Sequence, residues 1–406
     1  MGALQALREQ GYKGGITVIS REPNLPIDRT KLSKALIPDA SKVKLRPQEW
    51  FDSASIEIVY DEVSDVDFQS KKVSTKSGKF YSYTELILAT GGTPKMLPLP
   101  GFKDLDNVFL LRTIPHVQAI LSAVGEDKGK NIVVIGSSFI GMEVANCLSA
   151  NNNVTIVGME KKPLERIMGA EVGGIIQNII SKKGVKFHME AGVEKATPSS
   201  SDPKKVGAVQ LKDGTSLPAD LVILGVGVAP ATEYLKGNKS VELEKDGSLR
   251  CNENFQVTGL DHVYAIGDIA TYPYHGPGGN GTPTRIEHWN VAQNSGRSVG
   301  YSIAHPSSKP KSFIPVFWSA LGSQLRYCGN TPNGWDELVL KGQPEEGKFA
   351  AYYLQGETVV AVASMQMDPI MTKCAELMRR GKMVSKSDLK KGVDPLEVGL
   401  PAEVKI

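Results

Sequence analysis

The chain has 406 residues, and its 47 basic and 44 acidic side chains leave a formal net charge of +3. This length exceeds what one hydrophobic core supports, so two or three domains are expected. The weak charge gives no electrostatic reason to expect a nucleic-acid partner. The apolar runs are too short for a membrane span, so the composition predicts an ordinary globular protein.

The cysteines and histidines are scattered. No C-x-x-C pair occurs among the four cysteines, which are Cys147, Cys251, Cys328 and Cys374. This spacing predicts structural thiols in a reducing compartment. It also argues against a flavin enzyme that reduces disulfides, because such an enzyme needs a close cysteine pair. The six histidines show no metal-ligand spacing, so no protein-bound metal is expected.

The first ninety residues alternate between helix and strand patterns. Residues 3–10 predict a helix, and 16–20 (ITVIS) predict a buried strand. Residues 73–83 predict a hairpin that turns at Ser77-Gly78, and the apolar run 86–89 predicts another buried strand.

Residues 131–158 (NIVVIGSSFIGMEVANCLSANNNVTIVG) predict a strand, a tight glycine turn, a helix and a second parallel strand. A dinucleotide's pyrophosphate fits the N-terminus of such a helix, where backbone N–H groups and the helix dipole favour an anion. Gly136 permits the turn, Gly141 permits close packing of helix and strand, and Ser138 replaces the usual middle glycine.

The chain contains an internal repeat. The segment 73–94 matches 209–230 at a constant separation of 136 residues, and ITVISRE matches VTIVGME at 138. Two copies of one nucleotide-binding unit are therefore predicted. At this separation the glycine loop of the first copy falls at roughly −2 to +5, so most or all of it precedes Met1 and Gly2 is the one candidate remnant. The first strand and glycine loop of that copy are thus predicted to be missing, and we expect the chain to be a fragment of a longer protein.

Residues after 240 continue the pattern and then change it. A hairpin is predicted at Asp246-Gly247, a strand at 262–266 followed by Gly267-Asp268, and a helix at 286–304. Four strand patterns and a helix at 369–382 follow, which predicts an α+β domain. The expected fold is α/β, with two interleaved Rossmann-like domains. The expected boundaries are 1–114 and 240–311 for the first nucleotide-binding domain, 115–239 for the second, and 312–406 for the C-terminal domain.

Six motifs resemble those of the two-dinucleotide-fold flavoprotein reductases. They are LPIDRTKLSK, LILATGGTP, IGSSFIGMEVA, YAIGD, IEHW and FWSA. The family includes rubredoxin and ferredoxin reductases and apoptosis-inducing factor. The chain most resembles the apoptosis-inducing-factor-like branch, whose full-length members carry a Rieske iron–sulfur domain. The resemblance implies that the first domain binds FAD and the second binds NAD(P)H.

The resemblance also implies the FAD site. A guanidinium such as that of Arg29 forks onto phosphate oxygens, which suits the FAD pyrophosphate. Lys34 is expected beside the flavin N5 edge, paired with Glu143, so these two are the predicted catalytic residues. In isolation Arg29 and Lys34 read as ordinary loop charges, and the tryptophans as core residues. The other implied FAD contacts are Glu22, Val63, Thr90, Gly91, Arg112, Asp268, Glu287, His288, Trp289 and Trp318.

The second copy is expected to bind NAD(P). Gly158 directly follows the second strand, where NADH-selective relatives often carry an acid, and Glu160 comes two residues later. Glu160 suits a ribose 2′-hydroxyl, whereas Lys161 and Lys162 suit a 2′-phosphate, so NADH is favoured and NADPH stays open. The implied NAD(P) contacts are Gly136, Ser138, Gly141, Glu143, Glu160, Gly225, Val226 and Gly227.

The expected reaction moves a hydride from NAD(P)H to FAD and then single electrons to an iron–sulfur acceptor. The expected acceptor is a Rieske or ferredoxin-type domain, for which the missing N-terminal part of the same protein is one source. Two alternatives stay open: a signalling protein with vestigial NADH oxidase activity, and a cofactor-poor truncated remnant. The default location is the cytoplasm, with mitochondria as the alternative.

Overall fold

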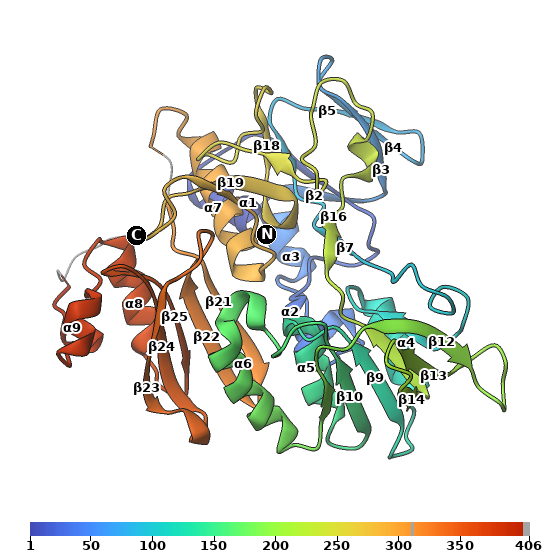
Figure 1. Ribbon diagram of the computed structural model, residues 1–406. Coiled ribbons are helices and arrows are strands. Elements are labelled where there is room, and N and C mark those ends of the chain that lie inside the picture. Colours follow the sequence, from blue (N-terminus) through green and yellow to red (C-terminus); the bar gives the residue numbers. More distant parts are fainter. Residues whose placement is uncertain (310–311, 401–406) are drawn as a thin grey trace. The chain divides into compact units, whose positions relative to one another are not determined.

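The computed structural model describes residues 1–309 and 312–400 (Figure 1). The end of the predicted segment 240–311 and the last six residues of 312–406 lie outside the described residues. The chain divides into two compact units, each built from three stretches. Unit 1 comprises Met1–Asp28, Ala40–Thr93 and Ala229–Phe317, and unit 2 comprises Arg29–Asp39, Pro94–Val228 and Trp318–Ile406.

The two units cut across the predicted boundaries at several points, among them Arg29–Asp39, residues 94–114 and residues 229–239. Arg29–Asp39 belongs to unit 2, although the sequence places it in the FAD-binding segment. The reason is that α2 (Thr30–Lys34) packs against α5 (Phe139–Leu148). The division into three domains stays a prediction.

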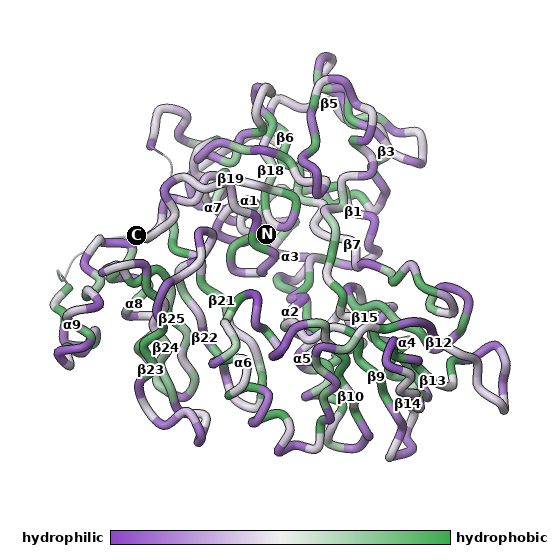
Figure 2. Tube along the Cα trace, in the orientation of Figure 1, coloured by the Kyte–Doolittle hydropathy of each residue, from purple (hydrophilic) through white to green (hydrophobic). Residues whose placement is uncertain are grey.

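Unit 2 contains a five-stranded parallel sheet in the order β11-β10-β9-β15-β8. The central strand β9 is buried on both faces, with Ile132, Val133 and Val134 at most 1% exposed. Figure 2 shows the hydrophobic character of β9 and β10. The elements are β8 (Val108–Leu110), α4 (Ile114–Val124), β9 (Asn131–Ile135), α5, β10 (Asn153–Val157), α6 (Glu165–Ser181), β11 (Lys186–His188) and β15 (Leu221–Leu224). A three-stranded sheet, β12 (Val193–Pro198), β13 (Val206–Leu211) and β14 (Ser216–Pro218), is inserted before β15.

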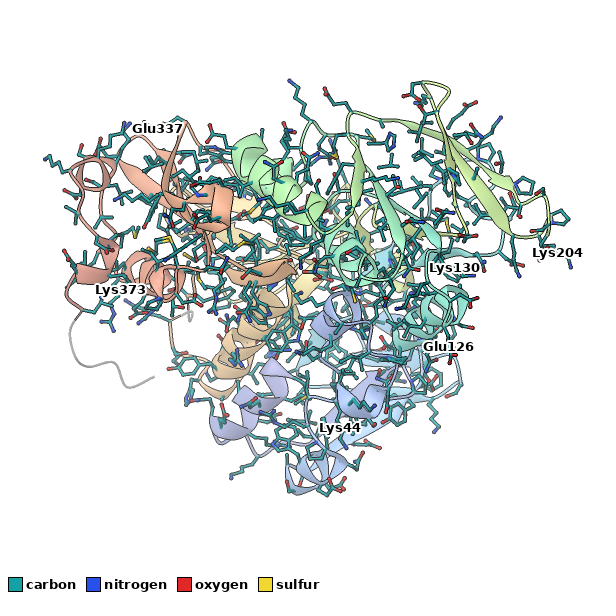
Figure 3. The ribbon with its side chains drawn as sticks, turned by 90° about the horizontal axis from the view of Figure 1, so that it is seen from below. Lys44, Glu126, Lys130, Lys204, Glu337 and Lys373 are labelled. Atoms are coloured by element: carbon teal, nitrogen blue, oxygen red, sulfur yellow. The ribbon has the colours of Figure 1, made fainter. Side chains whose placement is uncertain are left out.

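The C-terminal part of unit 2 is the predicted α+β region. Its sheet has the order β21-β22-β25-β24-β23, in which β25 runs antiparallel to β22 and β24, and β24 runs antiparallel to β23. The carboxylate of Glu337, which is labelled in Figure 3, ties the sheet to α9 through Lys386 at 3.2 Å and Lys390 at 2.7 Å. The elements are β21 (Val316–Leu321), β22 (Ser323–Gly329), β23 (Glu337–Gln343), η4 (Pro344–Glu346), β24 (Lys348–Gln355), β25 (Thr358–Met365), α8 (Ile370–Arg379), α9 (Lys386–Lys390) and η5 (Pro395–Glu397).

Unit 1 holds the first copy of the repeat. The predicted hairpin forms from β4 and β5, and Gly78 at its turn has φ +83°, close to the φ of +88° at the equivalent Gly214. The elements are α1 (Gly2–Glu9), β1 (Ile16–Ser20), η1 (Ala40–Lys42), α3 (Gln48–Ser53), β2 (Ile56–Tyr60), β3 (Val63–Asp67), β4 (Lys72–Thr75), β5 (Phe80–Ser82), β6 (Leu86–Leu88), η2 (Glu233–Leu235), β17 (Leu249–Arg250), β18 (Val263–Ala265), η3 (Gly267–Ile269), β19 (Ala270–Tyr274), β20 (Thr282–Thr284) and α7 (Trp289–Ala304). The short strands β7 (Gly92–Pro94) and β16 (Val228–Pro230) form a separate two-stranded sheet.

The unit 1 strands that correspond to β10 and β15 lie in two separate parallel pairs. In unit 2, β9 lies between β10 and β15, whereas the repeat equivalents of these two strands in unit 1, β1 and β6, pair with β2 and β18. Helix α1 packs closely on α7, since a Cβ on Gly300 would lie 2.8 Å from Ala3 O. The predicted absence of an opening strand in the first copy stays a prediction.

Candidate functional site

The turn between β9 and α5 brings three glycine backbones into contact. Gly136 has φ +113°, and a Cβ there would lie 2.3 Å from Gly225 O. A Cβ on Gly141 would lie 2.0 Å from Gly136 O, and one on Gly225 would lie 3.1 Å from Gly141 Cα. Glycine at these positions therefore lets the start of α5 approach the ends of β9 and β15.

The N-terminus of α5 has the features of an anion site. Ser138 is its N-cap residue, but the serine side chain makes no capping hydrogen bond. The positive end of the helix dipole and the backbone N–H groups of the first turn favour a phosphate at this position. The tight glycine turn and the small Ser138 side chain therefore fit a dinucleotide pyrophosphate.

Two further predicted NAD(P) residues, Val226 and Gly227, follow β15. Gly227 has φ +92°, and a Cβ added there would meet no atom within 4 Å.

Glu160 lies next to this turn. Its carboxylate accepts from Ser137 Oγ at 3.2 Å and pairs with Arg166 Nε at 2.8 Å. A Cβ on Gly158 would lie 2.6 Å from Ser137 Oγ, so an acid directly after β10 would displace that serine. Lys162 donates to Gln177 Oε1 at 3.3 Å, whereas Lys161 is exposed. Glu160 thus lies beside the glycine turn with Arg166 as an adjacent cation, and its contact with a ribose stays a prediction.

The predicted pair of Lys34 and Glu143 is in contact. Lys34 Nζ lies 3.0 Å from Glu143 Oε1, and the glutamate side chain is 4% exposed. Glu143 follows Gly141 by two residues on α5, so one helix carries both the glycine turn and the buried carboxylate. The role of the pair in a hydride transfer stays a prediction.

Two serines that the sequence reasoning missed complete this cluster. Ser33 Oγ donates to Glu143 Oε2 at 2.5 Å, and Ser319 Oγ donates to Oε1 at 2.5 Å. Both serines stand in the recognised motifs LPIDRTKLSK and FWSA. Their positions next to Lys34 and Trp318 were the sequence signal that pointed to the site. Serine is too common a residue type for its presence alone to indicate a functional role.

Other predicted FAD residues also lie in unit 2. Arg29 Nη1 donates to the carbonyl oxygen of Arg112 at 3.0 Å, which fixes one edge of the guanidinium. Trp318 lies on β21 and is half-buried.

The remaining predicted FAD residues lie in unit 1. Asp268 is 7% exposed, in the turn after β18, and the preceding Gly267 has φ +70°. Thr90 Oγ1 donates to Ala231 O at 2.8 Å, and Gly91 O accepts from Ala231 N at 2.8 Å, so both hold neighbouring backbone. A buried carboxylate beside a left-handed glycine fits a hydroxylated chain such as the ribityl group of FAD.

The start of α7 arranges three more of these residues. Glu287 pairs with Arg285 Nη1 at 2.5 Å. His288 Nδ1 caps the helix by accepting from Asn290 N at 3.2 Å, and its ring lies 5.2 Å from that of Phe317. Trp289 is the first residue of α7. This capping hydrogen bond gives His288 a structural role, and its contact with the flavin stays a prediction.

Two predicted FAD residues lie on or next to strands of unit 1. Glu22 follows β1, and its backbone N–H donates to Ser20 Oγ at 3.3 Å. Val63 begins β3 opposite Thr75.

The four cysteines carry free thiols, and burial makes them poor nucleophiles. Burial raises the pKa of Cys251 and Cys374 to about 12, and it also raises the pKa of Cys147 and Cys328. Because the thiolate is the reactive form, thiol chemistry at neutral pH is disfavoured.

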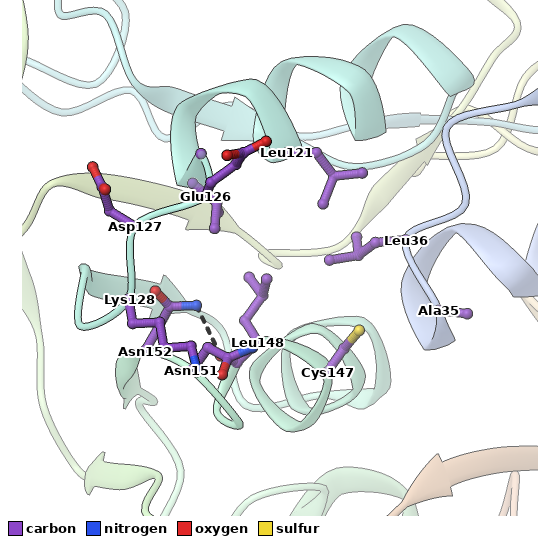
Figure 4. A pocket seen from close by; sticks show the side chains of 12 residues that line it. Ala35, Leu36, Leu121, Glu126, Asp127, Lys128, Cys147, Leu148, Asn151 and Asn152 are labelled. Atoms are coloured by element: carbon purple, nitrogen blue, oxygen red, sulfur yellow. Dashed lines mark hydrogen bonds between the residues drawn. The ribbon is translucent and has the colours of Figure 1, made fainter.

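A pocket of about 260 Å³ lies at the C-terminal ends of α2, α4 and α5 (Figure 4). Leu36, Leu121 and Leu148 line it, and Glu126 and Asp127 stand at its edge. None of the predicted site residues lines this pocket. Its position therefore says nothing about the cofactor.

Two kinds of feature are absent from the described residues. No group of three or more His, Cys, Asp and Glu side chains there could hold a metal ion. Within the same residues, no helix combines the length and apolar character that crossing a membrane requires.

Comparison with known proteins identifies two family regions. Residues 1–296 match the pyridine nucleotide-disulphide oxidoreductase model, and residues 316–397 match the reductase C-terminal model. Apoptosis-inducing factor 3 of Mus musculus is 34% identical over 388 residues, which cover 95% of this chain. The chain spans only 62% of that relative's length.

Two further proteins match nearly end to end. The benzene 1,2-dioxygenase system ferredoxin–NAD(+) reductase subunit of Pseudomonas putida is 29% identical, over 89% of this chain and 85% of its own. The crystal structure of a ferredoxin reductase from Rhodopseudomonas palustris has a TM-score of 0.87 at 28% identity, covering 96% of both chains. The chain therefore belongs to the pyridine nucleotide-disulphide oxidoreductase family, whose members use FAD and NAD(P)H.

Proposed function

We propose that this chain is an FAD-dependent oxidoreductase that takes a hydride from NAD(P)H and passes electrons to a ferredoxin-type iron–sulfur partner. The observation that carries the proposal is that α5 bears both the glycine turn and Glu143, whose carboxylate holds Lys34 at 3.0 Å. One helix thus joins the features of a dinucleotide site to a buried charged pair. Two of the similar proteins are named as ferredoxin reductases, which supports the choice of partner.

The proposal assigns a task to each region. Residues 1–114 and 240–311 would bind FAD, 115–239 would bind NAD(P)H, and 312–406 would form the C-terminal domain. Bound FAD would supply a hydride acceptor and the ability to release electrons singly. The chain would bind the cofactors, exclude water, and place the Lys34 cation where negative charge develops, while Glu143 holds that cation in position.

We further propose that the enzyme favours NADH. Glu160 accepts from Ser137 Oγ beside the glycine turn, where a carboxylate can take a ribose 2′-hydroxyl and repels a 2′-phosphate. Arg166, 77% exposed and already paired with Glu160, would be released toward a phosphate if the acid were removed.

Replacing Glu160 by alanine is therefore expected to shift preference toward NADPH. We expect the ratio of kcat/KM for NADPH to that for NADH to rise by about tenfold or more. The repulsion between the Glu160 carboxylate and the 2′-phosphate is lost, and Arg166 becomes available to pair with that phosphate. Steady-state kinetics with both nucleotides measure the ratio. In the control Glu160→Ala/Arg166→Ala, most of the gain should vanish. An unchanged ratio in Glu160→Ala would show that this acid does not face the ribose.

The proposed acceptor is a Rieske or ferredoxin-type domain. The similarity to apoptosis-inducing factor 3 favours a second candidate, a signalling protein with vestigial NADH oxidase activity. The two differ in whether electrons reach a cluster.

The purified protein tests the proposal. Mixed with NADH without oxygen, it should lose the visible absorbance of its flavin, and an added oxidised [2Fe–2S] ferredoxin or Rieske protein should then become reduced. Flavin reduction with no electron transfer to either acceptor would favour the signalling candidate. A colourless protein that releases no FAD on denaturation would support the cofactor-poor remnant.

A further inference from the structure

Glu143 is a buried carboxylate that accepts hydrogen bonds on both of its oxygens. The residue is 3% exposed, and each of its oxygens receives a hydroxyl, from Ser33 on Oε2 and from Ser319 on Oε1. Lys34 adds a third donor on Oε1. A carboxylate this far from water is stable as an anion only when such donors replace its hydration. Both hydroxyls therefore replace part of the hydration that burial removes, and they also orient the carboxylate.

The cluster joins three separate parts of unit 2. Ser33 lies on α2, directly before Lys34. Glu143 lies on α5, and Ser319 lies on β21. A second link holds β21 to α5 near the next turn, where Asn146 Nδ2 donates to Ala320 O at 3.4 Å. Lys183 Nζ donates in turn to Asn146 Oδ1 at 3.2 Å. The position of Ser319 relative to Glu143 is therefore fixed by the backbone of β21.

We propose that Ser33 and Ser319 are positioning residues that lock the Glu143 carboxylate in one rotation, and thereby fix the Lys34 ammonium. Because each oxygen has its own hydroxyl donor, the carboxylate cannot turn away from Lys34 without breaking both hydrogen bonds. The C-terminal region would then act in flavin reduction through Ser319. This inference rests on the proposed function for its kinetic consequence but not for the geometry that it asserts.

The first test measures Lys34 without any cofactor chemistry. In the whole protein, the rate at which an amine-acylating reagent labels Lys34 is followed by mass spectrometry, with exposed Lys204 as internal reference (Figure 3). Ser33→Ala and Ser319→Ala should each speed Lys34 labelling severalfold relative to Lys204. The matched control is Ser364→Ala, since Ser364 is buried like Ser33 and Ser319 but its hydroxyl has no hydrogen-bond partner among the described residues.

The second test measures the reaction. With NADH in single-turnover experiments, each of the two alanine variants should lower the limiting rate of flavin reduction about fivefold or more. The NADH concentration giving half of that rate should change less than about twofold, because the serines are expected to act on the transition state. Ser33→Thr, which retains the hydroxyl, should recover most of the rate. A serine that only supports the fold would not separate these two parameters.

The outcomes separate the two proposals. If Lys34 labelling in both serine variants equals that in Ser364→Ala, the positioning role is wrong. If labelling rises but flavin reduction matches the Ser364→Ala control, the claim that the cluster acts in the reaction is overturned. If the wild-type protein is not reduced by NADH, the proposed function fails, while labelling still decides whether the serines fix Lys34.

Discussion

Lys34→Met is expected to slow flavin reduction by NADH at least about tenfold and to lower the free energy of unfolding by about 2–4 kcal/mol. The substitution keeps the apolar stem but removes the cation that lies 3.0 Å from a carboxylate with 4% side-chain exposure. Breaking a buried pair leaves an uncompensated charge, although Ser33 and Ser319 still donate to Glu143 and reduce the loss. Stopped-flow absorbance and urea denaturation measure the two effects.

The control for this prediction is a lysine in an exposed pair. Lys205 lies 3.5 Å from Asp202 and is 52% exposed, so Lys205→Met should change the unfolding free energy by less than about 0.5 kcal/mol. The double variant Lys34→Met/Glu143→Gln should be less destabilised than the two single effects summed, because no charge is left unpaired. A flavin reduction rate in Lys34→Met equal to the wild-type rate would contradict the proposed role of the cation.

Gly141→Ala is expected to weaken NADH binding at least about tenfold and to destabilise the protein by roughly 1–3 kcal/mol. The new Cβ would lie 2.0 Å from Gly136 O and 3.3 Å from Val134 Cγ1. Since the closest neighbour is backbone, α5 must move away from the turn, which widens the expected pyrophosphate site. NADH titration and urea denaturation measure the two losses.

A second glycine serves as the matched control. Gly174 lies in the helical interior of α6, and a Cβ there would come no closer than 3.9 Å to Lys162 Cε. Gly174→Ala should therefore stabilise the protein by roughly 0.4–1 kcal/mol and leave NADH binding unchanged. If Gly141→Ala binds NADH as tightly as Gly174→Ala does, the glycine turn is not the dinucleotide site.

Local sequence patterns predicted many of the elements, although not the long helix α6. The apolar run 131–135, the helix after the glycine turn and the hairpin at Ser77-Gly78 were all readable, because periodicity and glycine turns act over a few residues. The family was readable from motifs for the same reason. The helices α3 and α4 were not predicted, and neither N-cap residue, Pro47 or Thr113, makes a side-chain capping hydrogen bond.

The sequence alone determined the family, the two-copy repeat and the residues of the glycine turn, since each is written in contiguous motifs. Only the tertiary structure decided the surroundings of Glu143. Its donors Ser33 and Ser319 lie 110 and 176 residues away along the chain, and serine occurs too widely for its type to mark such a role. The packing of α2 on α5 and the course of β21 set these contacts. Burial then makes the contacts matter, because a carboxylate withdrawn from water depends on every donor that it has.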